Sequence, residues 1–485
     1  MPFNTQYKTA MGGMFSYFDQ ELKQPGQWQL IRNAQVNEIG WIQQRYGMAQ
    51  YGDIPSAHTV QGLYHLDSSN NAYDQTVMYS NGVGYYYVSG TWTSKETGLS
   101  TSQFFDFKVF TNLLFRTNIT DGLKSWTGNT ADAFGTTNAV SAPAAAHLEV
   151  FQERLYAAKT SANPSVVYYS SIPNLSNAIT WDTTNDWFAV APDDGQEITG
   201  MVQMGYWLYI FKTNSTYRWD GNQLYHFSDV GTSNSRSISA SDQSIFFLRD
   251  TGIKQSRGIY LISGDGSRRI STPIQDYLDR VPEGQSTPAI FDGRHYLVYL
   301  GQTNGLDKVI ADYDLFASQT FGYDVWQLHT VPDIVTYFAQ IGGMIYVGSS
   351  DGAVLTFNDP SVYQDDGVDI AFELRTAQMS GVDRMNKSFW HGVWVQGERL
   401  SDVTFSLAND AANTDSLYGT AKYGIATYQA PSLFTAAITL DEQFTRKTVN
   451  KVGRSMQSRL YKATNTPPAI IKGIELEYSD YGRSY

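Results

Sequence analysis

The sequence predicts an all-β protein, a β-propeller of six or seven blades with an N-terminal arm and an additional C-terminal β-domain. The chain holds 33 Tyr, 25 Phe and 11 Trp, which suit half-buried strands, and 41 Gly, which suit tight turns. Strand-turn-strand units also recur at spacings that straddle the roughly 40–50 residues of a four-stranded blade. These units centre on Met78, Leu114, Tyr156, Leu208, Phe246, Leu297 and Ile345.

The sequence predicts that residues 1–55 form an extended N-terminal arm. The segment contains Pro25, Trp28 and a polar stretch over residues 31–40, and it lacks the repeated apolar strand followed by a polar turn. Few regular strands are expected in it.

The sequence predicts that residues 56–370 form the propeller. The pattern of strand, polar turn and strand is clearest over residues 113–126, 208–219 and 344–357. The blade number depends on whether the segment around Met78 forms a complete blade. The recurrence of the units favours a propeller over a β-sandwich. Asp-Gly pairs supply the residues of positive φ that tight hairpins need, and they begin at Asp121, Asp194, Asp220, Asp265, Asp292, Asp351 and Asp366.

The sequence predicts that residues 371–485 form a second β-domain, which closes the propeller or docks onto it. Val403, Phe405 and Leu407 alternate with polar residues as in a strand, and residues 471–478 are typical of a final strand. Basic residues gather in this region, either on a solvated strand face or at a contact with an acidic neighbour or with DNA. They are Arg446, Lys447, Lys451, Arg454, Arg459 and Lys462.

Charge and composition exclude several classes of protein. The formal net charge of −13 argues against a broad phosphate-neutralising surface, although it suits a conduit past which DNA slides. The absence of cysteine excludes disulfides, zinc ribbons and cysteine nucleophiles. The sequence contains neither a secretory signal pattern nor about 18 uninterrupted apolar residues, so we expect a soluble protein made in a cytoplasm.

No motif predicts catalysis, a metal site or a cofactor. Residues 348–352 formally fit G-x-S-x-G, but strands rather than a strand and a helix flank them, which indicates a hairpin turn. The seven histidines lack metal-ligand spacing. The pairs Asp193-Asp194 and Asp365-Asp366 do not continue into a calcium-binding loop. We therefore expect no enzyme.

Two other classes of function stay open at this point. A carbohydrate-binding or glycoside-cleaving propeller would need a pair of carboxylates, for which Asp182, Asp220 and Asp265 are candidates. A peptide-binding scaffold of the WD type would fit the dipeptides Trp181-Asp182 and Trp219-Asp220, but no Gly-His pair precedes them at the expected offset.

Several segments of the chain are similar to the tail nozzle or hub proteins of short-tailed bacteriophages, also called packaged-DNA stabilisation proteins. Residues 25–47 resemble the N-terminal pattern of this family through Asn33, Val36, Asn37, Glu38, Gly40, Arg45 and Gly47. Residues 113–128 resemble a blade segment of the family, although Ile119 stands where Gly is usual. Further similar segments are residues 154–158, 167–174, 181–188, 345–357 and 363–376.

The resemblance implies a structural virion protein that forms a homo-oligomeric ring, usually a hexamer, in the phage tail. Such a ring lies below the portal and the tail adaptor protein, with tail needle or fibre proteins beside or below it. Double-stranded DNA passes through its channel without sequence-specific contact and is retained there until ejection. The resemblance implies synthesis in the host bacterial cytoplasm, and it brings no catalytic residue.

Contacts between subunits are expected from the arm before Gly47 and from the domain after Arg375. The reason is that a rigid propeller leaves its attached segments to bind neighbours. The expected assembly contacts are Trp28, Arg32, Glu38, Arg45, Arg446, Lys447, Lys451, Arg454 and Arg459.

Overall fold

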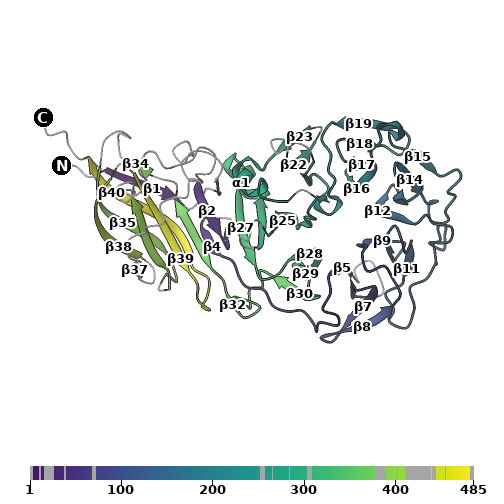
Figure 1. Cartoon of the computed structure of the whole chain (residues 1–485), viewed down its shortest axis with the longest axis horizontal. Helices are drawn as coiled ribbons and strands as arrows, with labels where there is room; N and C mark the ends of the chain where they lie inside the picture. Colours follow the sequence, from purple (N-terminus) through teal and green to yellow (C-terminus); the bar gives the residue numbers. More distant parts are fainter. Residues whose placement is uncertain are drawn as a thin grey trace.

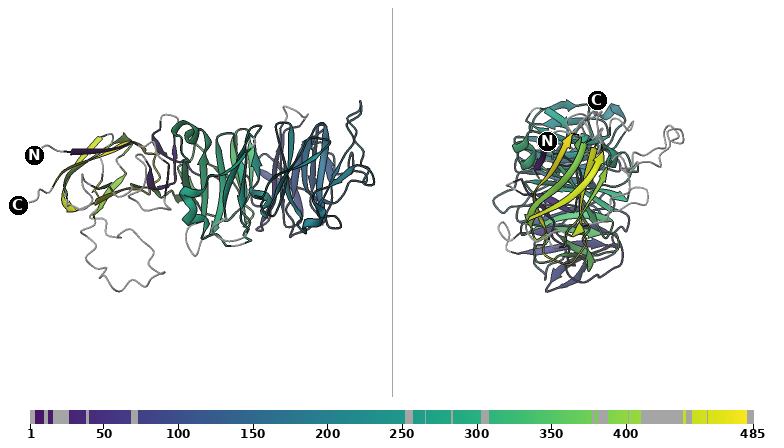
Figure 2. Two further views of the ribbon diagram at one scale, coloured as in Figure 1. Left: turned by 90° about the horizontal axis from the view of Figure 1, so that it is seen from above. Right: turned by 90° about the vertical axis from the view of Figure 1, so that its left-hand side faces the viewer.

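The structure is a computed structural model of the 485-residue chain. It describes residues 4–9, 13–15, 27–37, 40–67, 73–251, 257–264, 266–282, 284–302, 308–376, 379–380, 388–400, 402–409, 438–439, 444–453 and 455–480. Figure 1 shows a ring of small sheets at one end of an elongated molecule and a second β-domain at the other. Both termini lie at the outer end of the second domain, as the two views of Figure 2 also show.

Among the described residues, seven antiparallel groups of three or four strands form a closed ring, so the fold is a seven-bladed β-propeller. The first four blades are β5 (Val60–Leu66) to β8 (Thr91–Glu96), β9 (Asp106–Phe110) to β11 (Lys124–Trp126), β12 (Ala145–Phe151) to β15 (Trp187–Ala189), and β16 (Ile198–Met204) to β19 (Leu224–Ser228). The last three are β20 (Ser239–Ala240) to β23 (Gly266–Arg269), β24 (Ala289–Phe291) to β27 (Trp326–Val331), and β28 (Val335–Ile341) to β30 (Val354–Phe357).

The middle strands of these blades complete each sheet in chain order. They are β6 (Gln75–Ser80), β7 (Val83–Val88), β10 (Leu113–Thr117), β13 (Arg154–Thr160), β14 (Val166–Tyr169), β17 (Trp207–Lys212), β18 (Thr216–Trp219), β21 (Ile245–Arg249), β22 (Gly258–Ser263), β25 (His295–Gln302), β26 (Lys308–Asp314) and β29 (Met344–Ser349). Two short helices, α1 (Gln275–Leu278) and α2 (Leu315–Phe321), lie before β24 and between β26 and β27.

The first strand of every blade lies on the inside of the ring. Each inner strand contacts the inner strand of the next blade, and β28 contacts β5, so the circle is complete. Separate apolar clusters fill the spaces between neighbouring blades, for example around Leu148 and Leu155 and around Phe211 and Phe247. This matches the predicted repeat, in which each unit buries its faces against its neighbours. The prediction of an all-β propeller is confirmed.

Five predicted Asp-Gly turns lie between paired strands, those at Asp121, Asp220, Asp292, Asp351 and Asp366, whereas Asp194-Gly195 ends a short helix between β15 and β16, and Asp265 lies outside the described residues. The pair Asp366-Gly367 connects β31 (Gln364–Asp365) with β32 (Val368–Asp369), and both of its residues have positive φ, 47° and 82°. This is the conformation of a tight two-residue hairpin turn. The G-x-S-x-G segment is likewise the hairpin turn between β29 and β30, and Ser349 is buried there.

A segment from the N-terminal side completes the last blade. Residues 47–51 lie along β30, where the Tyr51 N–H donates to the carbonyl of Val354 at 2.7 Å and the Thr356 N–H donates to the carbonyl of Ala49 at 2.8 Å. The seventh blade therefore combines a strand that precedes the propeller with three strands that end it. Pairing the two ends of the ring in one sheet resists its opening, because separation would break this ladder.

We expect Gly47→Ala to weaken the closure of the ring. A Cβ at residue 47 would overlap the backbone of Gln364, which cannot move without breaking its own pairing. Overpacking of this kind costs about 1–3 kcal/mol of unfolding free energy. Denaturant unfolding and limited proteolysis between blades one and seven measure the effect. Gly135→Ala is the matched control, since no atom lies within 4 Å of its added Cβ, and a similar loss in that control would contradict the argument.

The second domain consists of two facing sheets. One sheet has the order β3 (Ala34–Val36), β4 (Ile42–Gln44), β40 (Ile470–Asp480), β35 (Ser388–Glu398) and β38 (Phe444–Gly453), with β1 (Asn4–Thr9) also paired to β40. The other contains β2 (Trp28–Arg32), β33 (Phe372–Thr376), β39 (Ser455–Lys462), β36 (Thr404–Asn409) and β37 (Ile438–Thr439), with β34 (Met379–Ser380) paired to β39.

One continuous sheet connects the propeller to the second domain. The strand β2 pairs in parallel with β27 of the sixth blade and antiparallel with β33, so ten strands form a single sheet. One apolar core runs through this connection and contains Trp28, Phe246, Trp326 and Leu460. The two parts therefore share both backbone pairing and buried side chains.

The N-terminal region differs from the extended arm that the sequence predicted. Its strands β2, β3 and β4 are three to five residues long and occupy positions within the two sheets of the second domain. The physical reason is that β2 pairs with β33 and β4 pairs with β40, both more than 300 residues away, while β3 joins its sheet through β4. A local sequence pattern does not reveal such distant pairing.

Candidate functional site

Two of the predicted assembly residues are buried inside the chain. Trp28 is 0% exposed within the shared core, and Arg45 is 1% exposed. Neither side chain can reach a neighbouring subunit, and both stabilise the connection between propeller and second domain. The prediction of surface contacts is wrong for these two residues.

Two other predicted assembly residues come together on the second domain. Arg32 on β2 and Arg459 on β39 both approach the carboxylate of Glu373 on β33, at 3.8 Å and 2.6 Å. Arg375 on the same strand contacts this carboxylate at 2.7 Å. Glu373 is 3% exposed, whereas the three arginine side chains are 27–32% exposed. In this arginine cluster, Arg32, Arg375 and Arg459, three partly exposed arginine side chains thus surround one buried carboxylate.

The remaining predicted contacts are described only in part. Arg446, Lys447 and Lys451 belong to β38, which pairs with β35 and is the last strand of its sheet in the described topology. Glu38, Arg454 and the side chains on β38 lie outside the described residues. Lys462 from the same basic region is 1% exposed and donates to the carbonyl of Pro467, so it is not part of a solvated face.

Arg45 lies just before residues 47–51, which complete the last blade, and it connects this segment to β27 and to β31. Its guanidinium forms a bidentate ion pair with Asp365, with one Nη1 to Oδ1 distance of 2.7 Å. It also donates to the carbonyls of Tyr46 and Thr330, both at 2.8 Å. The side chains of the pair are 0% and 9% exposed. A bidentate pair with additional backbone acceptors fixes the geometry of all three segments.

A second buried network lies on the sixth blade, next to the connection with the second domain. The carboxylate of Asp312 accepts from His295 Nδ1 at 2.8 Å, from His329 Nε2 at 3.0 Å and from Gln327 Nε2 at 3.2 Å. Gln35 of β3 reaches the same carboxylate at 3.3 Å. Asp312 and His329 are fully buried. Through Gln35, the carboxylate links the sixth blade to β3 of the second domain.

The protonation states of this network follow from its contacts. Burial opposes the charged form of His295, but the carboxylate of Asp312 overcomes it and raises the pKa of His295 to about 9. Burial lowers the pKa of His329 despite its contact with Asp312. Although burial opposes its ionised form, the two histidines hold the pKa of Asp312 well below its usual range. At neutral pH the network thus contains charged His295, ionised Asp312 and neutral His329.

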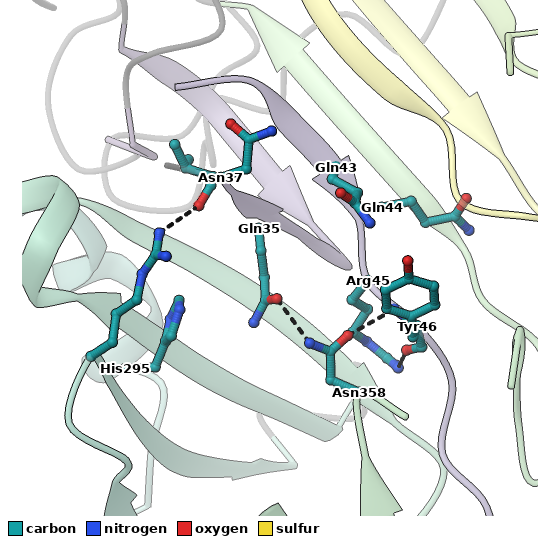
Figure 3. A pocket seen from close by; sticks show the side chains of 10 residues that line it. Gln35, Asn37, Gln43, Gln44, Arg45, Tyr46, His295 and Asn358 are labelled. Atoms are coloured by element: carbon teal, nitrogen blue, oxygen red, sulfur yellow. Dashed lines mark hydrogen bonds between the residues drawn. The ribbon is translucent and has the colours of Figure 1, made fainter. Parts of the chain in front are cut away.

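A polar cleft opens beside this network, between the propeller and β3 and β4 (Figure 3). Its two adjoining parts have volumes of about 410 and 390 Å³ and share Gln35, His295 and Asn358. Hydrogen bonds within the chain use some of the polar groups of this cleft. Asn358 donates to Gln35 at 2.9 Å and accepts from the Tyr46 N–H at 2.8 Å. The cleft is a polar joint between the propeller and the second domain.

The inner strands of the propeller enclose a second cavity of about 530 Å³. Its wall comes from β9, β12, β13, β16, β20, β24 and β28 and from the residues just before β9, β20 and β24, and it contains charged and aromatic side chains. These are Phe104, Asp106, Lys108, His147, Glu149, Lys159, Arg236 and Tyr337. No sequence motif pointed to this cavity, since six different blades contribute to it.

The carboxylates considered for glycoside cleavage do not meet in this cavity. Asp182 accepts from the N–H groups of Thr184 and Asn185 within one turn. Asp220 accepts likewise from the N–H groups of Asn222 and Gln223. Both therefore serve as turn residues, and Asp265 lies outside the described residues.

Across the residues that the structure describes, no group of three or more His, Asp or Glu side chains is arranged to hold a metal ion. The same residues include no helix long and apolar enough to cross a membrane.

No protein-family model matches the sequence, and no curated protein matches it. Solved structures resemble it at the level of fold. BamB from Moraxella catarrhalis is 10% identical with a TM-score of 0.39, and the match covers 73% of this chain and 97% of that one. The Pan2 WD40 domain from Neurospora crassa is 6% identical with a TM-score of 0.40, over 65% and 94% of the two chains. The C-terminal WD40 domain of Sif2 is 11% identical with a TM-score of 0.38, over 65% and 99%.

Proposed function

We propose that the chain is a structural subunit of a bacteriophage tail, the nozzle or hub ring through which DNA leaves the virion. The observation that carries this proposal is the ten-stranded sheet that fuses the sixth blade to the second domain. Shared backbone pairing and a shared core make one rigid body, which suits a part that holds its position under load. Of the segments similar to tail nozzle proteins, residues 25–47, 345–357 and 363–376 include strands of this connection and of the last blade, while the others lie in the second and third blades.

The DNA conduit would lie between copies of the chain and not inside one propeller. The cavity within a propeller has about 530 Å³. Duplex DNA does not fit there, since its major groove alone is about 12 Å wide and 8.5 Å deep. A closed ring of subunits, six in tails of this kind, leaves an axial hole whose size depends on the copy number. The net charge of −13 suits a wall that repels the DNA backbone.

The arginine cluster around Glu373 supplies a contact for such a ring. Neighbours in a rotationally closed ring meet through two different surfaces, so a basic patch on an acidic protein can meet an acidic surface of the next copy. Electrostatic complementarity of this type fixes register and increases the rate of association.

Electron microscopy of the purified protein, with and without the tail adaptor protein of its source, tests the proposal. We expect closed rings with an axial hole, at least in the presence of the adaptor. Monomers under both conditions would overturn it and would favour the carbohydrate-binding propeller, for which a glycan-binding screen is the next measurement.

Removing the excess charge of the arginine cluster is expected to weaken ring formation. The double variant Arg32→Gln/Arg459→Gln leaves Arg375 to neutralise Glu373, so the fold is retained. We expect at least a tenfold loss in assembly affinity, about 1.4 kcal/mol, and a smaller salt dependence. Sedimentation measures both. Lys472→Gln is the control because its exposed ion pair with Glu398 lies on the other sheet. Equal assembly by the double variant and the control would exclude the cluster from the interface.

A further inference from the structure

We propose that the central cavity of the propeller is a binding site for a small anionic ligand that also carries hydroxyl groups, a sugar acid or a sugar phosphate. This inference does not depend on a role in a phage tail. The cavity volume of about 530 Å³ lies within the range of roughly 300–1,000 Å³ that is usual for small-molecule sites.

Arg236 supplies the positive charge for an anionic group. Its guanidinium lies 3.5 Å from the ring centroid of Phe104, and it donates to the carbonyl of Thr336 and to the hydroxyl of Ser286. None of these partners is a carboxylate. Burial lowers the pKa of Arg236 to about 10, and Tyr337, a phenol whose own pKa is raised by burial, has a smaller and opposite effect. Arg236 is thus a half-buried cation that faces the cavity and has no carboxylate among these partners. Such a cation favours the binding of an anion in the cavity.

The other cations of the wall are already neutralised. Lys108 forms an ion pair with Glu149 at 2.9 Å, and Lys159 forms one with Glu197 at 2.6 Å. The carboxylate of Asp106 accepts from the N–H groups of Phe107 and Leu148, at 2.9 and 2.8 Å. Among the described cavity residues, Arg236 is thus the cation whose charge is left for a ligand.

His147 provides a separate indication of a ligand. Its Nε2 atom is buried and has no hydrogen-bond partner among the described residues, although it belongs to the cavity wall. Burial, with a further contribution from Lys159, lowers the pKa of His147 to about 3, so the ring is neutral and can donate or accept one hydrogen bond. A buried polar atom without a partner is costly, and a ligand hydroxyl would satisfy it.

The carboxylates of the wall indicate why hydroxyl groups are expected on the ligand. Asp106 and Glu149 retain acceptor positions besides those that their present partners use, since a carboxylate offers about four. A sugar presents several hydroxyl donors to such acceptors, while its acidic group meets Arg236.

Isothermal titration calorimetry of the full chain with glucuronate, glucose 6-phosphate and neutral glucose tests the site. We expect saturable one-site binding of at least one of the two anions, and binding of glucose at least tenfold weaker. Binding of glucuronate alone would identify a carboxylate site, and binding of glucose 6-phosphate alone would identify a phosphate site. No saturable binding of either anion up to about 10 mM, far weaker than ordinary ligand affinities, would overturn the proposal.

The variant Arg236→Gln removes the charge and keeps hydrogen-bonding capacity. We expect it to bind the anion at least tenfold more weakly while its melting temperature without ligand does not fall, because an uncompensated cation is lost. Arg268→Gln is the matched control, since that arginine is 53% exposed and pairs with Asp324 outside the cavity. Equal affinity of Arg236→Gln and the wild type would contradict the assignment of Arg236.

Discussion

Replacing Arg45 with alanine is expected to destabilise the protein by about 3–5 kcal/mol, because the buried carboxylate of Asp365 loses its counter-ion. Asp365 lies between the seventh blade and the second domain, and the pair is almost fully shielded from water. The variant also leaves the carbonyl of Thr330 without the guanidinium that donates to it. Chemical denaturation followed by tryptophan fluorescence gives the change in unfolding free energy.

A double-mutant cycle separates the pair from its surroundings. The variant Arg45→Ala/Asp365→Ala should lose clearly less than the sum of the two single variants, since removing both charges leaves neither one buried alone. The control Lys472→Ala breaks an exposed ion pair and should cost less than about 1 kcal/mol. Strict additivity of Arg45→Ala and Asp365→Ala would show that the ion pair is not the cause.

The connection between the two domains explains which parts of the fold could be predicted. Propeller blades consist of strands that pair with their neighbours in sequence, as β5 to β8 do, so a local period reveals them. The strand β2 pairs with β33 through Trp28 and Thr376, 348 positions apart, and only the folded chain brings them together. The same reason hides the last blade, which combines residues 47–51 with β30.

The residues of the candidate sites were also difficult to predict where their contacts are distant in the sequence. Arg45 belongs to the arm that the sequence predicts to contact neighbouring subunits, and its buried partner Asp365 lies 320 residues away, in what the sequence marks as a turn. Arg32 and Arg459 could be selected as basic residues, but the buried Glu373 between them was not foreseen. Arg236 and His147 carry no motif, since the inner strands of six blades form their cavity.

The network of Asp312 is expected to make the stability of the protein depend on pH. The pKa of His295 is about 9 in the folded chain, against about 6.5 in an unfolded one, so its contribution is complete below pH 6.5 and disappears as the pH rises to 9. The pKa of His329 is lowered, so stability also falls when the pH drops below about 6.5 and the unfolded chain binds the extra proton. Stability should therefore be highest near pH 6.5.

Asp312→Ala removes the carboxylate that accepts from both histidines and from Gln327. We expect a loss of about 3–5 kcal/mol at pH 6.5, because the variant leaves the donors of His295, His329 and Gln327 without the carboxylate that accepts from them. Between pH 6.5 and 9 the wild type should lose about 3 kcal/mol as His295 releases its proton, whereas the variant should lose little. Urea denaturation at pH 5, 6.5, 8 and 9 measures both curves.

His226→Gln is the matched control for this experiment, because His226 is an exposed histidine that pairs with an exposed Asp229. It should keep the decline of the wild type between pH 6.5 and 9. If Asp312→Ala retained that decline, another group would have to titrate in this range, and the ion pair of His295 with Asp312 could not be its source. If instead the decline vanished in the variant alone, the buried carboxylate would be the group that couples the protonation of His295 to the stability of the joint between the domains.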